Sequence, residues 1–332
     1  MAFAPGGGWL SGMNRRAFLA RSSALAAASV LLRPKVFGQS APSAAATPAA
    51  APRPAPVATE FRPLRRNVGC FIGRGGTIGW LASQEALVVV DTQFPDTAAR
   101  CLAGLPGRGE RLVDVVFNTH HHGDHTGGNP IFKPASKTIV AHRNVPKLQL
   151  RAAERNDTTW QQVFADTLFD DGWQHDCGDE IVTARHFGPA HTGGAAIITF
   201  ERANVVHMGD LMFNRMYPVI DRPGGASIRN WIGILEHGAR EFPSDAIFIY
   251  GHGNAKFGVS GARADLLVMR DYLAALLAHV EKEIAAGKTK AEIRQLANLP
   301  GFPDFFPAPG QASRLPANLD VAYDELTAKK PA

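Results

Sequence analysis

A ten-residue segment rich in histidine constrains this chain more than any other feature. Residues 119–128 read Thr-His-His-His-Gly-Asp-His-Thr-Gly-Gly, with four histidines and one aspartate inside six positions. The apolar run at 113–117 predicts a β-strand that ends just before the segment, and the glycines predict tight turns within it. Four neutral histidines buried in one loop would need many hydrogen bonds. The segment therefore predicts a metal-binding loop at the end of a strand.

The spacing within the segment separates its ligands into two directions. Alternate residues of an extended chain share a face, so His120 and His122 are predicted to point the same way and His121 the other way. Asp124 and His125 lie at the following turn and can address a second direction. The pattern can therefore serve two adjacent metals, and its imidazole and carboxylate groups suit zinc, iron or manganese.

The charge of the chain is concentrated at its N-terminus. The net charge is +5 over 332 residues, and residues 1–38 carry five basic and no acidic side chains, so the remainder is neutral. A neutral remainder does not support a nucleic-acid-binding surface. The composition, 45% hydrophobic and 20% charged, is that of an ordinary globular protein.

Three segments are predicted along the chain. Residues 1–38 resemble a twin-arginine export signal, with Arg15 and Arg16 before an apolar stretch and a cleavage position after Gly38. Residues 39–60 are an Ala/Pro-rich linker, and residues 61–332 form one domain with a helical C-terminal tail. We therefore expect export to the periplasm, with no stable membrane anchoring after cleavage.

Four stations along the chain resemble the metallo-β-lactamase superfamily. The first is His120-His121-His122-Gly123-Asp124-His125, which fits the signature His-x-His-x-Asp-His and is followed by a glycine pair. The others are Gly188-Pro189-Ala190-His191-Thr192-Gly193, Met208-Gly209-Asp210 and Tyr250-Gly251-His252-Gly253. They occur in the order of the family and span roughly residues 65–260.

The resemblance implies a fold and a ligand set. The fold is α+β, an αββα four-layer sandwich with the metals at one edge of its two sheets. Carried over position by position, two Zn2+ ions are expected, with Asp210 bridging them. One ion takes His120, His122 and His191, and the other takes Asp124, His125 and His252.

The resemblance also implies a reaction, the hydrolysis of a small molecule. A metal-bound hydroxide would attack the carbonyl of a β-lactam, lactone, ester or thioester, and Asp124 would orient the nucleophile and move a proton to the leaving group. The alternative is a mononuclear iron enzyme of the persulfide dioxygenase type, against which the complete second ligand set argues. The sequence does not predict the oligomeric state.

Residues near the stations carry further expectations. Asp91 is expected to orient the histidines by hydrogen bonds, and Gly73-Arg74-Gly75-Gly76 to form a hairpin turn rather than a phosphate loop. Phe213 stands where related β-lactamases hold a substrate carboxylate with lysine, and Arg215 is a candidate substitute. Phe71 and Trp80 can be either core residues or walls of the substrate cavity, and His207 can either support the metal ligands or belong to the core. Cys70, Cys101 and Cys177 lie outside the four motifs, so they are not expected to be metal ligands, and their roles stay open.

Overall fold

The computed structural model describes residues 58–328 of the chain. The predicted export signal, residues 1–38, lies outside this range, as does the predicted linker apart from its last three residues. Within the described range, no helix is long and apolar enough to cross a membrane.

The first sheet combines an antiparallel meander with a parallel half. Its seven strands follow chain order, with β1 to β4 antiparallel and β4 to β7 parallel. They are β1 (Glu60–Arg65), β2 (Val68–Ile72), β3 (Ile78–Ala82), β4 (Leu87–Val90), β5 (Val115–Asn118), β6 (Ile139–His142) and β7 (Thr167–Phe169). The runs Leu-Val-Val-Val of β4 and Val-Val-Phe of β5 are continuously apolar because both faces of this sheet are covered.

The second sheet has six strands in the order β15-β13-β11-β10-β9-β8. They are β8 (Gly172–Asp176), β9 (Ile181–Arg185), β10 (Ile197–Phe200), β11 (Val205–His207), β13 (Ile247–Ile249) and β15 (Ser260–Gly261). A separate two-stranded parallel pair joins β12 (Phe213–Asn214) to β14 (His252–Gly253), with Phe213 opposite His252.

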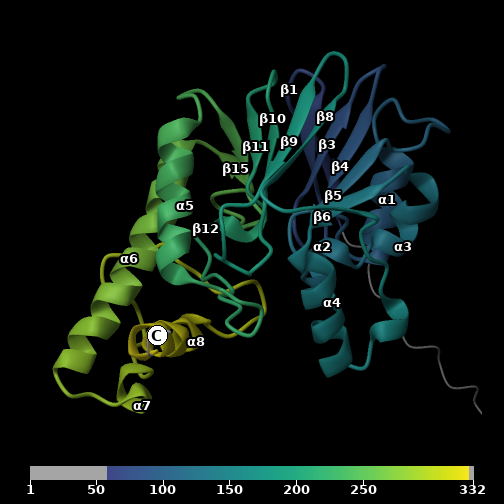
Figure 1. Cartoon of the computed structure of the whole chain (residues 1–332). Coiled ribbons are helices and arrows are strands. Elements are labelled where there is room, and N and C mark those ends of the chain that lie inside the picture. Colours follow the sequence, from purple (N-terminus) through teal and green to yellow (C-terminus); the bar gives the residue numbers. More distant parts are fainter. Residues whose placement is uncertain (1–57, 329–332) are drawn as a thin grey trace, which may run out of the picture. The chain divides into compact units, whose positions relative to one another are not determined.

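Helices cover the outer face of each sheet, as Figure 1 shows, so that the domain has four layers in the order αββα. The helices on the side of the first sheet are α1 (Pro95–Gly104), α2 (Gly123–Thr126), α3 (Asn129–Phe132) and α4 (Asn144–Arg155), with short 3-10 turns at Lys133–Ala135 and Thr159–Gln161. Those on the side of the second are α5 (Ile228–Glu241), α6 (Arg263–Ala285), α7 (Lys290–Ile293) and α8 (Leu315–Thr327), with a 3-10 turn η3 at Gly209–Leu211. The predicted fold class is confirmed.

Strand alternation divides the apolar residues between two cores. In β4, Val88 and Val90 face the core between the sheets together with Phe117, while Leu87 and Val89 face the core under α1 and α3. Each such side chain is fully buried and contributes about 1.5–3 kcal/mol of transfer free energy. The two cores hold the ends of β4 and β5 rigidly in place.

Helix α5 has apolar residues at helical spacing and begins directly after Ser227. The hydroxyl of Ser227 caps it by accepting the backbone N–H of Asn230 at 3.3 Å. Its apolar face includes the fully buried Trp231, whose indole N–H donates to the carbonyl of Leu211 at 2.9 Å. This bond ties α5 to the turn that carries Asp210.

Candidate metal centre

The structure brings all seven predicted ligand positions together at one edge of the sandwich. Four come from the loop and short helix that follow β5, and three come from the side of the second sheet. Ligand atoms within 4.8 Å of one another form three groups there, of which one joins His121, His122 and Asp221 and the other two consist of predicted ligands alone. The first group is His120, His122, His191 and Asp210, and the second is Asp124, His125 and His252.

Asp210, a member of the first group, contacts the histidines of each group with a different carboxylate oxygen. Its Oδ2 lies 3.4 Å from Nε2 of His191 and 3.7 Å from Nε2 of His120. Its Oδ1 lies 3.0 Å from Nε2 of His125 and 3.4 Å from Nε2 of His252. The carboxylate therefore stands between the groups.

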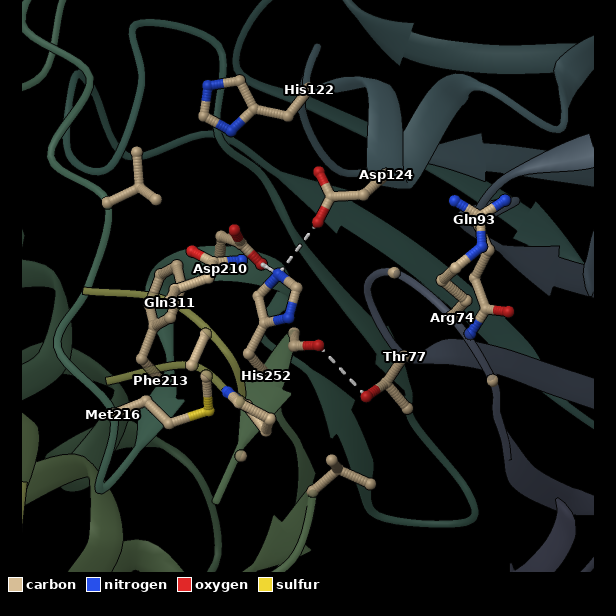
Figure 2. A pocket seen from close by; sticks show the side chains of 18 of the residues that line it. Arg74, Thr77, Gln93, His122, Asp124, Asp210, Phe213, Met216, His252 and Gln311 are labelled. Carbon is tan, nitrogen blue, oxygen red and sulfur yellow. Dashed lines mark hydrogen bonds and ion pairs between the residues drawn. The ribbon is translucent and has the colours of Figure 1, made fainter. Parts of the chain in front are cut away.

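The second group is the more open of the two. Oδ2 of Asp124 lies 3.2 Å from Nε2 of His252, the contact drawn as a dashed line in Figure 2. His125 is completely buried, whereas the side chains of Asp124 and His252 are 28% and 20% exposed. Asp124 and His252 therefore face the cavity.

The turn that carries Asp210 depends on glycine and on His207. Gly209 has a positive φ of 49°, and a Cβ at Gly251 would lie 2.0 Å from Oδ1 of Asp210. The ring of His207 accepts the N–H of Gly209 at 3.1 Å with Nδ1 and donates from Nε2 to the carbonyl of Thr77 at 3.0 Å. His207 therefore supports the Asp210 turn.

Asp91 orients two of the histidines, as expected. Its Oδ2 accepts from Nδ1 of His125 at 2.7 Å and from the hydroxyl of Thr119 at 2.8 Å. Since that hydroxyl proton is given to Asp91, the 3.0 Å contact between Thr119 Oγ1 and His120 Nδ1 must use the proton of the ring. Both imidazoles therefore direct Nε2 to the centre, where the neutral ring offers a lone pair.

Asp221 is a functional residue that the sequence did not reveal. Its Oδ2 lies 3.0 Å from Nε2 of His122 and 3.3 Å from Nε2 of His121, and its Oδ1 accepts the N–H of Gly224 at 2.9 Å. Nε2 of His122 therefore carries the proton, and its Nδ1 faces Nε2 of His191 at 3.1 Å. His121, which was predicted to point away from the metal ligands, contacts Asp221 and not the central carboxylate of Asp210. Asp221 stands alone in a Pro/Gly-rich loop, so no motif marks it.

Unpaired buried atoms show that the centre fits metal ions. Nε2 of His120 and Oδ1 of Asp210 are buried and have no hydrogen-bond partner within residues 58–328. Nδ1 of His191 donates to the carbonyl of Val219 at 2.8 Å, which leaves its Nε2 lone pair directed inwards as well. Burial lowers the pKa of His120 well below its ordinary value and that of His191 to about 3, so protons do not satisfy these lone pairs. A cation would satisfy them.

The second group concentrates charge even without a metal. Burial opposes protonation of His252, but the carboxylates of Asp210 and Asp124 outweigh it and raise the pKa of that imidazole to about 9. Burial likewise opposes ionisation of Asp124, but the imidazoles of His125 and His252 outweigh it and lower the pKa of its carboxyl. These carboxylates attract positive charge.

A cavity of about 700 Å³ opens onto the centre. Figure 2 shows Asp124, Asp210 and His252 at its base, with Phe213 and Met216 on one side and Arg74 and Gln93 on the other. Arg74 belongs to the turn between β2 and β3, the predicted hairpin.

Other candidate residues lie away from this cavity. Phe71 and Trp80 are core residues, 1% and 4% exposed. The guanidinium of Arg215 pairs with Asp265 at 2.6 Å, and Arg215 does not line the cavity. The three cysteines are free, buried and outside both groups.

The sequence profile of the metallo-beta-lactamase superfamily matches residues 72–277. The chain belongs to this superfamily. The match runs from the last residue of β2 through most of α6 and includes all residues of both ligand groups. The predicted membership of the metallo-beta-lactamase superfamily is therefore confirmed.

Individual relatives are more distant. A hydroxyacylglutathione hydrolase from Methylococcus capsulatus is 33% identical over 120 residues, which cover 36% of this chain and 41% of that protein. The chain thus matches about two fifths of the length of this relative.

Among solved structures, a metallo-beta-lactamase from Hirschia baltica has 19% identity and a TM-score of 0.53 over 66% of this chain and 98% of its own. A stereoselective inverting sec-alkylsulfatase from Pseudomonas sp. has 16% identity and a TM-score of 0.59 over 79% of this chain and 49% of its own. Identities this low show the shared fold alone.

Proposed function

We propose that the protein is a binuclear zinc hydrolase that acts on a small molecule with an activated carbonyl. The observation that carries this proposal is Asp210, whose two oxygens reach the two ligand groups separately. His120, His122 and His191 would hold one ion, and Asp124, His125 and His252 the other, with Asp210 between them. When bound, two zinc ions would lower the pKa of a water molecule and polarise the carbonyl oxygen of the substrate.

The side chains of the chain itself have distinct tasks in this reaction. Four imidazoles are held by neighbours so that a lone pair faces the centre, which fixes the geometry before any ligand arrives. Asp124 lines the cavity, where its carboxylate orients the attacking water and takes its proton to the leaving group. The apolar wall at Phe213 and Met216 excludes water from one side of the substrate.

The substrate class proposed is that of β-lactams, lactones, esters and thioesters. An acylglutathione is a thioester, so the similarity to a hydroxyacylglutathione hydrolase favours thioesters among these four. The cavity volume of about 700 Å³ suits a small molecule.

Elemental analysis of the protein purified without added metal tests the proposal. We expect about two zinc ions per chain, turnover of at least one of the four substrate classes, and loss of both in Asp210→Asn. Asp304 is exposed and pairs with Lys256, outside both ligand groups, so Asp304→Asn provides the control. This variant should keep both the zinc content and the turnover. One iron per chain with no second metal, together with oxygen consumption on a persulfide, would contradict the proposal and favour the alternative oxygenase.

We also propose that the protein is exported by the twin-arginine pathway to the periplasm. The support is the segment Arg15-Arg16 with its apolar stretch, which lies outside the described residues. A fusion of residues 1–60 to a reporter should reach the periplasm, and Arg15→Lys with Arg16→Lys should abolish this. Retention of the unmodified fusion in the cytoplasm would refute the proposal.

A further inference from the structure

We propose that Arg314 binds an anionic group of the substrate and makes the enzyme selective for activated carbonyl compounds that carry a carboxylate. Arg314 lies on the C-terminal segment, beyond residues 72–277 that match the superfamily profile. The inference rests on the proposed hydrolase function, since it assigns a specificity residue to the same cavity.

The C-terminal segment forms part of the cavity wall. Ala308, Pro309, Gln311 and Arg314 line the cavity that also contains Asp124, Asp210 and His252. In the view of Figure 2, Gln311 lies on the side of Phe213 and Asp210, and Arg74 lies on the opposite side of Asp124. A substrate at the metal centre is therefore enclosed in part by residues that the superfamily match does not include.

Contacts on both sides fix this segment to the domain. The backbone of Phe306 donates to the carbonyl of Arg215 at 3.1 Å and accepts the N–H of Tyr217 at 3.0 Å. The ring of Phe305 stacks on Tyr272 at 4.4 Å, and Leu315 after Arg314 is completely buried. Arg314 is thus held between two anchored points, at the residue before α8.

The charge of Arg314 is not neutralised within the described part of the chain. Its half-buried side chain makes one side-chain contact there, a hydrogen bond from Nη2 to Oε1 of Gln311 at 3.3 Å, and no ion pair with a carboxylate. By contrast, Arg74 across the cavity pairs with Asp96 at 2.6 Å and lies over the ring of Phe94 at 4.2 Å. Of the two arginines among the described residues that line the cavity, Arg314 is the one whose guanidinium remains free to bind an anion.

The chemistry of the group selects a carboxylate. A guanidinium presents paired N–H donors that match the two oxygens of a carboxylate, and such charge-assisted bonds are stronger than neutral ones. The electrophilic carbonyl must lie at the metal centre beside Asp124 and His252. The carboxylate would then lie at the end of the cavity formed by the C-terminal segment.

Two chromogenic esters with one leaving group test this inference. The probes are 4-nitrophenyl acetate, which is neutral, and mono-4-nitrophenyl succinate, which carries a carboxylate. We expect Arg314→Gln to raise KM for the succinate ester by about tenfold and to leave kcat unchanged. KM for the acetate ester should stay within about twofold. Arg314→Lys should retain part of the preference, because it keeps the charge and loses the paired donors.

A matched variant controls for the loss of one positive charge. Arg151 on α4 is exposed and does not line the cavity, so Arg151→Gln should change neither ester. Equal effects of Arg314→Gln on both esters, an unchanged preference, or a preference that disappears only in Arg74→Gln would overturn the inference.

A binding measurement separates this inference from the proposed function. Ligand-observed NMR with the metal-depleted protein should show the succinate ester bound by the wild type and by Arg151→Gln, and more weakly by Arg314→Gln. If the zinc-loaded wild type hydrolyses neither ester, the measurement still decides the role of Arg314. Equal binding by all three proteins would overturn that role even if hydrolysis were observed.

Discussion

The two ligand groups of the centre differ in how their side chains are held. In the first group each imidazole is fixed at the nitrogen that faces away from the centre: His120 by Thr119, His122 by Asp221 and His191 by the carbonyl of Val219. In the second group only His125 has such support, from Asp91. Within residues 58–328, the ring of His252 has polar contacts only with the centre itself and stacks on Phe213 at 5.1 Å.

The difference teaches which position is preorganised. Fixed tautomers and ring orientations reduce the entropy lost when a metal binds, so the first group should bind its ion more tightly. The second group, with Asp124 and His252 partly exposed, should exchange its ion more readily. The predictions below test this asymmetry, beginning with the largest effect.

Asp210→Asn should remove the asymmetry by damaging both positions. Loss of the anionic oxygens that reach each group should release both metals and lower turnover by about 10³-fold or more. Metal content and initial rates measure the effect. A variant that keeps two ions and near-normal rates would contradict the bridging position.

His252→Ala should break the second position alone. We expect one tightly bound ion to remain on the first group and the rate to fall by about 10²-fold, because the substrate carbonyl loses one source of polarisation. Stepwise zinc titration with a chelating indicator measures the two affinities. Simultaneous loss of both ions would show that the groups act as one unit.

Asp221→Ala should weaken the first position and leave the second intact. Removing an outer carboxylate that holds a metal-binding histidine costs about 10–100-fold in metal affinity. The same titration should then show two positions of similar affinity. Selective weakening of the second position instead would show that His122 does not belong to the first group.

Phe213→Leu should sharpen the comparison with a smaller effect. Without the aromatic face, His252 loses its stacking partner, and the second ion should bind a few-fold more weakly, in line with the about 0.5–1.5 kcal/mol of an aromatic pair. The first ion should be affected less, because His191, whose ring lies 5.7 Å from that of Phe213, is also held by the carbonyl of Val219. An unchanged second affinity would mean that stacking does not position His252.

The pair of His142 and His186 provides a control outside both groups. His142 is 5% exposed, its ring stacks on that of His186 at 3.8 Å, and its Nδ1 accepts the N–H of Asn144 at 3.4 Å. Burial and the neighbouring imidazole lower the pKa of His142 to about 4. Because the folded state disfavours protonated His142, the neutral imidazole contributes to the free energy of unfolding. That contribution is complete above about pH 6.5 and is lost as pH falls towards 4.

His142→Phe should therefore reduce the acid sensitivity of the metal-depleted protein. Between about pH 6.5 and 4, the free energy of unfolding of the wild type should fall by about 1–3 kcal/mol more than that of the variant. Urea titrations in the presence of a chelator measure it. Parallel pH profiles would show that His142 does not contribute, and metal content at neutral pH should be the same in both proteins.

The sequence predicted which side chains lie together at the candidate centre, because these residues are tied to local patterns. The loop after Val113–Phe117 and the station at Asp210 each follow an apolar strand, and strand ends meet at a sheet edge. The role of Asp221 was not predicted, because its contact with His122 joins residues 99 positions apart and follows no local sequence pattern. The strand at Glu60–Arg65 was not predicted. Its side chains are exposed or only partly buried, so its sequence lacks a clear alternation of apolar and polar residues. The placement of Arg314 depends on tertiary packing that no local pattern records.

The pair β12–β14 joins two tasks in one small structure. Phe213 lines the cavity and also stacks on His252, its neighbour across this pair. In the proposed enzyme, a substrate that displaces the Phe213 ring would also move the imidazole of His252. Occupancy of the cavity and occupancy of the second metal position are then thermodynamically linked, and the linkage is reciprocal. Each substrate would thus set its own apparent zinc requirement, and zinc concentration would change the order in which competing substrates are used.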